Sequence, residues 1–260
     1  MLGVPFLAGV ALSGPGWVQL PLLVAWLGGY GLSYFAMLAV KTGRPGKVRA
    51  QLVGFGTVTV TAAAVALLAR PQLLLLGPAF LALLAVNAWH SRRRGDRALL
   101  NGAVSAVGGS LGVPLAALAA PQPRLDGAVW AAFVVLALYF VGTVFFVKTM
   151  IRERGQARYL RLSVSWHVGA ALLAGLLAGP LGGSPAWPLA GSPAWPLGVS
   201  PAWPLAGSPA WPLGVFFGWL AVRAAWLPRH RLGPGRVGIV ELANSLVLLA
   251  LVLMLAGHGV

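Results

Sequence analysis

Residues 139–161, YFVGTVFFVKTMIRERGQARYLR, decide the class of fold. The stretch begins as an apolar helix and ends in a group of cations that only Glu153 relieves. These cations are Lys148, Arg152, Arg154, Arg158 and Arg161. Apolar runs of this length are unstable in water and clustered cations are unstable in hydrocarbon, so the boundary between them marks a membrane surface. The pattern recurs along the chain and predicts an all-α, polytopic transmembrane bundle.

Composition supports the same class, because 58% hydrophobic and 9% charged residues leave too little polar surface for a soluble protein. The formal net charge is +15, from 19 Lys and Arg against four acids. In a soluble domain this excess would suggest nucleic acid. Here the cations lie between apolar segments, so the expected partners are membrane lipids with anionic headgroups, and not nucleic acid. The chain has no cysteine, which excludes disulfides and thiol chemistry.

Nine apolar segments are predicted to span the membrane, so the bundle has about nine helices. They cover approximately residues 1–12, 18–40, 51–69, 72–89, 99–119, 128–150, 162–181, 213–227 and 239–255. Connections after the even-numbered spans are rich in Lys and Arg, and those after the odd-numbered spans are poor. The positive-inside rule then predicts a multi-pass protein of a bacterial cell membrane, with a cytoplasmic N-terminus and an extracytoplasmic C-terminus.

The first and eighth spans are the weakest. A dozen residues make a helix of about 18 Å against roughly 30 Å of hydrocarbon, so we expect the first span to be the remainder of a longer helix that begins before Met1. The eighth contains Arg223, which leaves a count of eight spans open. Gly108 with Gly112, and Gly175 with Gly179, have the GxxxG spacing that permits close helix approach.

Between the seventh and eighth spans, an octapeptide of the type SPAWPLAG or SPAWPLGV occurs four times. Two prolines in each octad exclude a regular helix, and we expect an extended or turn-rich extracytoplasmic loop. We therefore divide the chain into residues 1–183 with seven helices, the loop 184–213, and residues 214–260 with two helices. The repeated tryptophans are either interfacial anchors, a docking site, or the product of tandem expansion in a tolerant loop.

Polar residues within or beside the spans are the candidates for chemistry, because such residues are costly in lipid and face the bundle interior. The candidates for a cavity or an anion-binding site are Asn87, His90, Arg93, Arg94, Arg97, Asn101, Tyr139, Lys148, Arg152, Arg154, His167 and Glu241. Together they are expected to line the cytoplasmic half of one cavity. The alternative is that the cations only determine topology and that His167 is hydrogen-bonded inside the bundle.

Glu241 is the most informative of these residues. We place it at the start of the last helix, where an acid caps the helix, pairs with Arg223 or Arg236, or carries protons. Pairing is the favoured interpretation.

Motifs for metal or nucleotide binding are weak. With only four acids in the chain, a magnesium site built from several carboxylates is nearly excluded by ligand supply, so no metal and no cofactor are predicted. Gly233, Gly235 and Gly238 match GxGxxG, but no βαβ unit surrounds them, which favours a basic turn.

Three segments carry a resemblance to a known family. VPFLAGVALSGPGW (4–17), LLAVNAWHSRRRGDRALLN (83–101) and ALYFVGTVFFVKTMIRERG (137–155) resemble the YwiC-like family of bacterial membrane proteins. Members of that family usually carry a His-Gly-Ala-Trp element just before the first span, and this sequence begins at Met1 without it. The resemblance implies an integral membrane protein without an established biochemical function, and it implies no cofactor.

A more remote similarity is to the UbiA prenyltransferases, which resemble this chain in helix number, orientation and basic residues after the fourth helix. Those enzymes hold magnesium with two Asp-rich motifs, whereas the matching segments here, 33–44 and 148–154, carry cations. Three functions follow as hypotheses. The first is a membrane protein whose basic cytoplasmic face contacts anionic lipid. The second is a UbiA-like lipid or prenyl transferase that uses Arg and Lys in place of magnesium. The third is a transporter, which would require a polar site at the membrane midplane.

Overall fold

The computed structural model describes residues 2–93, 98–181 and 211–257. Over these ranges the secondary structure consists of ten α-helices and three short 3-10 helices, which confirms the all-α prediction. The chain divides into two compact units, an N-terminal unit of residues 2–125 and a C-terminal unit that begins at Asp126. Each of the nine predicted segments contains at least one helix.

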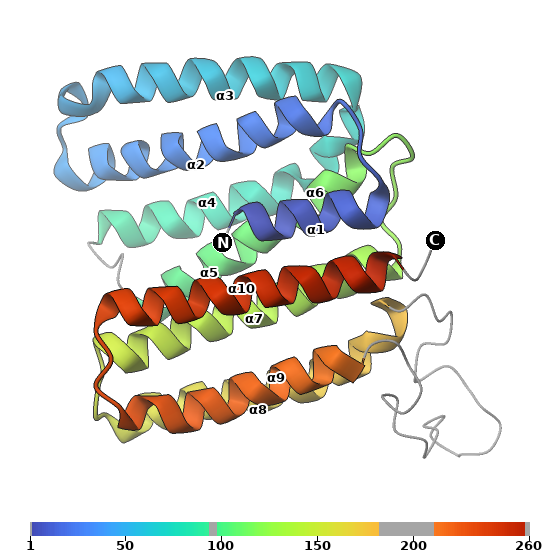
Figure 1. Cartoon of the computed structure of the whole chain (residues 1–260). Coiled ribbons are helices and arrows are strands. Elements are labelled where there is room, and N and C mark those ends of the chain that lie inside the picture. Colours follow the sequence, from blue (N-terminus) through green and yellow to red (C-terminus); the bar gives the residue numbers. More distant parts are fainter. Residues whose placement is uncertain (1, 94–97, 182–210, 258–260) are drawn as a thin grey trace. The chain divides into compact units, whose positions relative to one another are not determined.

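Helices of the N-terminal unit run side by side in alternating directions (Figure 1). Most of their backbone groups are bonded within a helix, which lipid requires because it offers no alternative partner. The α-helices are α1 (Gly3–Ser13), α2 (Gln19–Thr42), α3 (Arg49–Ala69), α4 (Gly77–Arg92), α5 (Leu99–Ser110) and α6 (Gly112–Leu118). Two 3-10 helices, η1 (Pro45–Val48) and η2 (Pro71–Leu76), connect α2 to α3 and α3 to α4.

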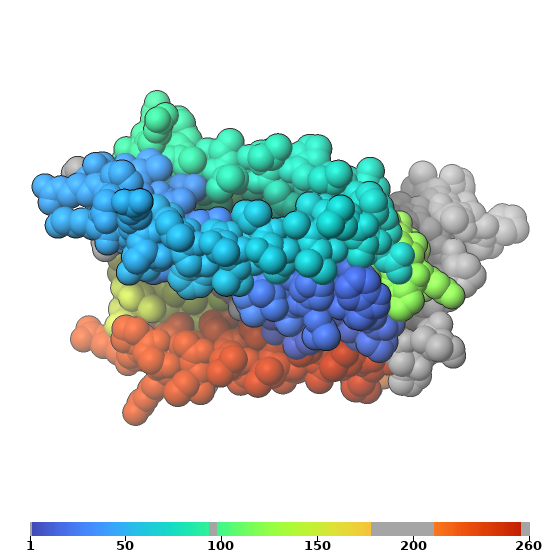
Figure 2. Space-filling model, turned by 90° about the horizontal axis from the view of Figure 1, so that it is seen from above, coloured from blue at the N-terminus to red at the C-terminus, as the bar shows by residue number. Residues whose placement is uncertain are grey.

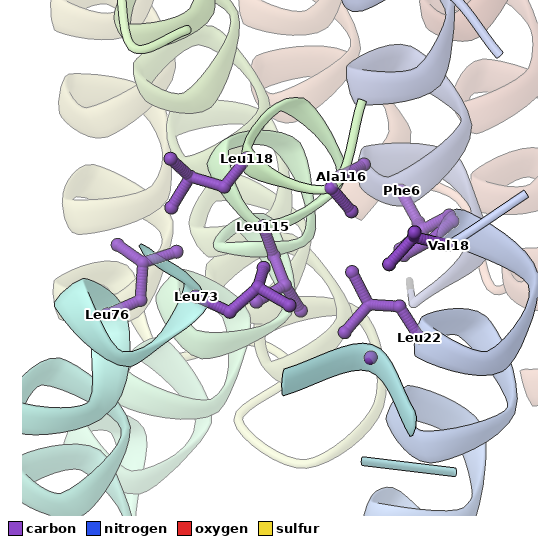
Figure 3. Packing of buried hydrophobic residues seen from close by; sticks show 10 residues of the cluster. Phe6, Val18, Leu22, Leu73, Leu76, Leu115, Ala116 and Leu118 are labelled. Carbon is purple, nitrogen blue, oxygen red and sulfur yellow. The ribbon is translucent and has the colours of Figure 1, made fainter. Parts of the chain in front are cut away.

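The core of this unit is a cluster of buried aliphatic and aromatic side chains. Phe6 of α1, Leu22 of α2, Leu73 and Leu76 of η2, and Leu115 of α6 point toward one another (Figure 3). The close approach of α1 to α6 requires glycine, because a Cβ atom on Gly9 would lie 2.4 Å from the carbonyl oxygen of Val113. In contrast, large apolar side chains on α2 and α3 are exposed, as expected for lipid-facing helices; Figure 2 shows the surface that α3 contributes.

The fifth predicted span is interrupted, which corrects the single helix expected over 99–119. Helix α5 ends at Ser110 and α6 begins at Gly112. Pro114 lacks the N–H group that would bond to the carbonyl of Ser110, so the regular ladder of hydrogen bonds cannot continue through this point. Taken together, α5 and α6 still cover the length of one span.

The C-terminal unit contains four long helices. They are α7 (Gly127–Ile151), α8 (Ala157–Leu181), α9 (Trp211–Trp226) and α10 (Pro234–Gly257), and a 3-10 turn, η3 (Leu227–Arg229), follows α9. Helix α8 packs against α7 and α9, and α10 contacts all three. Asp126 caps α7 by accepting a hydrogen bond from the Val129 amide at 3.0 Å. The 25 residues of α7 extend about 37 Å, enough to cross a bilayer core.

Two helices of this unit begin earlier in the sequence than their approximate predicted starts. The last helix begins at Pro234 and not near Ile239, because proline at the first helical position needs no partner for its missing N–H. Gly235 and Gly238 are therefore helical and do not form the expected turn. Helix α9 begins at Trp211, so residues 211–213 are helical although we assigned them to the repeat loop. The rest of that loop, 184–210, lies outside the described residues.

Seven helical stretches in the described part of the chain are long and apolar enough to cross a membrane. They are 19–42, 45–69, 71–92, 99–118, 127–151, 157–177 and 234–255. Helix α1, with 11 residues, is shorter, as expected for the first span. The protein is therefore a multi-pass membrane protein.

Candidate functional site

A buried ion pair lies in the C-terminal unit. The Nη1 atom of Arg223, on α9, donates a hydrogen bond to Oε1 of Glu241, on α10. The Arg223 side chain is 0% exposed, and Glu241 is also buried. Of the interpretations for Glu241, pairing with Arg223 is the one that the structure contains. The capping alternative is wrong, because α10 begins seven residues earlier.

Helix α7 supplies the other partners of the Glu241 carboxylate. Oε2 accepts a hydrogen bond from the Thr143 hydroxyl at 2.7 Å and a longer one from the Tyr139 hydroxyl at 3.4 Å. These two residues are four positions apart and therefore share a helix face. The Tyr139 hydroxyl also lies 3.0 Å from the Ser245 hydroxyl, one turn after Glu241. Three helices therefore meet at one carboxylate, whose two oxygens have three donor groups within hydrogen-bond distance, although the single Tyr139 proton is shared with the backbone carbonyl of Glu241 at 3.0 Å.

The guanidinium of Arg223 has fewer of its polar atoms hydrogen-bonded than the Glu241 carboxylate has. Its Cζ atom lies 4.1 Å from the centre of the Phe146 ring, a cation–π contact from α7. Its Nε and Nη2 atoms are buried and reach no hydrogen-bond acceptor among the described residues. The Ser163 hydroxyl, on α8, is likewise buried without a partner in that part of the chain. Unsatisfied polar groups of this kind are costly in a protein interior and call for a physical explanation.

His167 is the residue through which α8 contributes to this network. Its Nδ1 atom lies 2.7 Å from the carbonyl oxygen of Ser163, one turn earlier on α8. Its Nε2 atom faces α7 at Gly142, where a Cβ atom would come within 3.0 Å of it. His167 is also close enough to Arg223 for their charges to interact. The buried network, defined here as Tyr139, Thr143, His167, Arg223, Glu241 and Ser245, thus draws on α7, α8, α9 and α10.

Three of the four helices that carry the network, α7, α8 and α10, are among the stretches long and apolar enough to cross a membrane. Tyr139 is the thirteenth of the 25 residues of α7 and so lies close to the middle of that helix. Glu241 lies seven residues into α10, or about 10 Å from its first residue. Ionisable groups at such depth are expensive, and they usually mark a site rather than a structural element.

Comparison with known proteins identifies the family. A family model described as YwiC-like protein matches residues 1–117. An uncharacterized protein named YwiC from Bacillus subtilis (strain 168) is 30% identical over 176 residues, covering 68% of this chain and 73% of that protein. The chain belongs to the YwiC-like family. An uncharacterized protein of Haemophilus influenzae (strain ATCC 51907 / DSM 11121 / KW20 / Rd) is 29% identical over 173 residues, covering 65% of this chain and 71% of its own length. No solved structure matches the chain.

The YwiC-like match confirms the family that the sequence resembles. The part covered by the family model falls within the N-terminal unit, apart from the first residue, whereas the buried network lies in residues 139–245. Three members of the network, Thr143, Arg223 and Ser245, are not among the twelve candidate residues, although Arg223 was named as a possible partner of Glu241. The signal for Arg223 was available, since it is a single cation inside an apolar helix. Ser245 carried no signal of its own, because serine is common in transmembrane helices.

In this YwiC-like protein, predicted site residues of the C-terminal unit fall in two places. Tyr139, His167 and Glu241 belong to the buried network. The remaining ones, Lys148, Arg152 and Arg154, lie at or just beyond the end of α7. Lys148 is 3.9 Å from Glu153 and lies over the Tyr159 ring.

Arg154 joins two connections of the C-terminal unit through hydrogen bonds to backbone carbonyls. It donates hydrogen bonds to the carbonyl oxygens of Met150 at 3.0 Å and Leu232 at 2.8 Å. This side chain therefore joins the α7–α8 turn to the α9–α10 connection, and both connections lie at one end of the C-terminal unit.

The other predicted residues belong to the N-terminal unit. The amide oxygen of Asn87, on α4, accepts a hydrogen bond from the Ser105 hydroxyl, on α5, at 3.2 Å. His90 is buried, with Nδ1 2.9 Å from the carbonyl oxygen of Val86. Arg93 lies over the Trp89 ring at 4.3 Å. Asn101 lies in the first turn of α5. Arg94 and Arg97 lie outside the described residues.

The expectation of one cavity shared by all twelve candidates stays a prediction, because they are divided between the two units. In the described ranges, no group of three His, Cys, Asp or Glu side chains is arranged to hold a metal ion.

Proposed function

We propose that this YwiC-like protein presents basic ends to the cytoplasmic side of the membrane, where they contact anionic lipid headgroups. The observation that carries the proposal is the sorting of charge within each unit. In the N-terminal unit, the α2–α3 connection and the last turn of α4 lie at the same end of the helices (Figure 1). Lys41, Arg44, Lys47 and Arg49 lie in or beside that connection, and Arg92 and Arg93 lie at the end of α4.

The C-terminal unit repeats this arrangement, because Arg154 holds its two basic connections together. The basic end of this unit is defined as Lys148, Arg152, Arg154, Arg158, Arg161, Arg229, Arg231 and Arg236. Glu153 is the only acid that accompanies them in these segments. Each Lys or Arg near an anionic leaflet contributes about 1 kcal/mol of attraction.

Two of these cations work against helix stability. Arg158 and Arg161 lie in the first turns of α8, where the helix dipole disfavours positive charge. Their side chains are exposed. A role outside the helix, in orienting the chain and binding headgroups, accounts for cations at this position. By the positive-inside rule, the N-terminus is then cytoplasmic and the C-terminus extracytoplasmic.

The lipid proposal is tested by removing charge without removing bulk. We expect the triple variant Arg152→Gln, Arg158→Gln, Arg161→Gln to retain less phosphatidylglycerol than the wild type when each is purified from mixed bilayers containing phosphatidylcholine. The matched control replaces the same three residues by lysine, which keeps the charge. Lipid mass spectrometry of the purified proteins measures the ratio. Equal retention by the glutamine and lysine variants would contradict headgroup contact at this end.

A second candidate function, transport, is favoured by the buried network. A buried charged pair with unsatisfied donors, in a bundle of apolar helices, is a candidate for the polar site that a transporter needs, and a purely lipid-binding role does not use it. Its test is solute-driven movement of protons into proteoliposomes that enclose a pH dye. Loss of the flux in Glu241→Gln, with retained flux in Arg229→Gln, would support transport through this network.

The UbiA-like alternative, lipid or prenyl transfer with cations in place of magnesium, has less support. It requires free cations, whereas Arg154 is bonded to two backbone carbonyls and Lys148 lies beside Glu153. Stoichiometric isoprenoid diphosphate on the purified protein would favour this alternative over the other two.

A further inference from the structure

The buried guanidinium of Arg223 has more donors than its surroundings have acceptors. Nη1 donates to Glu241, whereas Nε and Nη2 find no acceptor in the described ranges. These two atoms lie on one edge of the planar guanidinium, with parallel N–H bonds. That edge matches the spacing of two oxygens of one carboxylate.

The oxygens of the Glu241 carboxylate are already engaged. Oε1 of Glu241 accepts from Arg223, and Oε2 accepts from Thr143 and Tyr139. The Phe146 ring covers the guanidinium from α7 without offering an oxygen. Satisfying Nε and Nη2 therefore requires a group that brings its own acceptors.

Charge balance limits what this group can be. The pair of Arg223 and Glu241 is neutral, and in the part of the chain that the structure describes the other titratable side chains facing it are Tyr139 on α7 and His167 on α8. Adding a carboxylate would leave an excess negative charge in hydrocarbon, which is strongly unfavourable. A proton taken up with the carboxylate removes this excess. A proton on His167 would balance the charge but leave two cations and two anions buried, whereas a proton on Glu241 leaves only Arg223 and the bound carboxylate charged, so we place the proton on Glu241.

We propose that the Nε–Nη2 edge of Arg223 binds a small carboxylate and that Glu241 takes up one proton in the same step. The Glu241 carboxylate becomes a carboxylic acid, Arg223 keeps its charge, and the bound carboxylate replaces Glu241 as the counter-ion. No other bond is made or broken. The proposal deepens the transport candidate by naming its solute class and the coupled ion.

The experiment uses the purified full chain in detergent, with formate as the probe. Titration calorimetry measures binding, and the pH change in weakly buffered solution counts protons. We expect the wild type to take up one proton for each formate bound. Glu241→Gln imitates the protonated acid, so this variant is expected to bind formate without proton uptake. Because the assay needs no bilayer, it can succeed even where the flux test fails, and it does not depend on lipid contact.

Two controls separate this site from exposed titratable side chains. The double variant Arg223→Gln, Glu241→Gln leaves no buried unpaired charge, and we expect it to stay folded and to lose formate binding. His230→Gln removes an exposed titratable side chain of the same unit, outside both the network and the basic end, and is expected to keep both binding and proton uptake. Wild-type binding without a proton, binding that persists in the double variant, or no wild-type binding at all would overturn the proposal.

Discussion

The pair of Arg223 and Glu241 couples two helices through opposite charges that neither residue could carry alone at this depth. Arg223→Gln leaves the Glu241 carboxylate buried without its counter-ion, and we expect it to lower the free energy of unfolding by about 3–5 kcal/mol. The double variant Arg223→Gln, Glu241→Gln removes both charges and is expected to lose much less. Thermal unfolding in detergent, followed by tryptophan fluorescence, measures the difference. A double variant as unstable as the single one would show that packing, and not charge, governs the site.

Gly9 is a second residue whose type is determined by its neighbours, because they leave no room for a side chain. In Gly9→Ala the new methyl group would meet the Val113 carbonyl oxygen at 2.4 Å, and a backbone atom cannot move aside cheaply. We expect α1 and α6 to separate, at a cost of about 1–3 kcal/mol in stability. Gly54→Ala is the matched control, because no described atom lies within 4 Å of that position. Thermal melting in detergent compares the two, and equal melting temperatures would contradict close packing of α1 on α6.

At the scale of helices, the sequence predicts the apolar segments well and their interruptions poorly. Hydrocarbon requires a continuous helix, so nine apolar runs identify the helical regions almost by themselves. Pro114 and Pro234 are both evident in the sequence, but they have opposite effects. Pro114 lies in an apolar run and interrupts a helix, whereas Pro234 follows a loop and begins one. The two GxxxG pairs also look alike in the sequence but have different surroundings in the structure. A Cβ atom on Gly112 would lie 3.1 Å from the backbone nitrogen of Phe6, whereas a Cβ atom on Gly175 would meet no described neighbour within 4 Å.

The start of α7 depends on one side chain that can be tested separately. The Asp126 carboxylate accepts a hydrogen bond from the Val129 amide, which has no partner inside the helix. We expect Asp126→Ala to lower stability by about 0.5–2 kcal/mol, whereas Asp126→Asn keeps an oxygen acceptor and most of the stability. Chemical or thermal unfolding of the purified variants measures both. Equal losses in the two variants would assign the effect to charge rather than to capping.

At the scale of the whole molecule, the buried network shows what a linear pattern cannot give. Tyr139 and Glu241 are 102 residues apart in sequence, and no spacing rule connects them. Each was recognisable as a polar residue in an apolar helix, so the members could be named but not assembled. The sequence offers both Arg223 and Arg236 as partners of Glu241, and only the packing of the helices shows that Arg223 is the counter-ion. The grouping follows from which helices pack together, and this depends on the summed contacts of many apolar side chains.

The absence of cysteine makes the proposed threading directly testable, since every introduced thiol is the only one in the chain. Gly46, before α3, and Ala157, at the start of α8, belong to basic connections, whereas Gln122 precedes α7 at a poor one. All three positions are exposed. We expect a membrane-impermeant maleimide to label Gln122→Cys in intact cells, and to label Gly46→Cys and Ala157→Cys only after permeabilisation, because clustered cations resist translocation. Labelling of Gly46→Cys and Ala157→Cys from opposite sides would contradict the alternation of charge on which the proposed orientation depends.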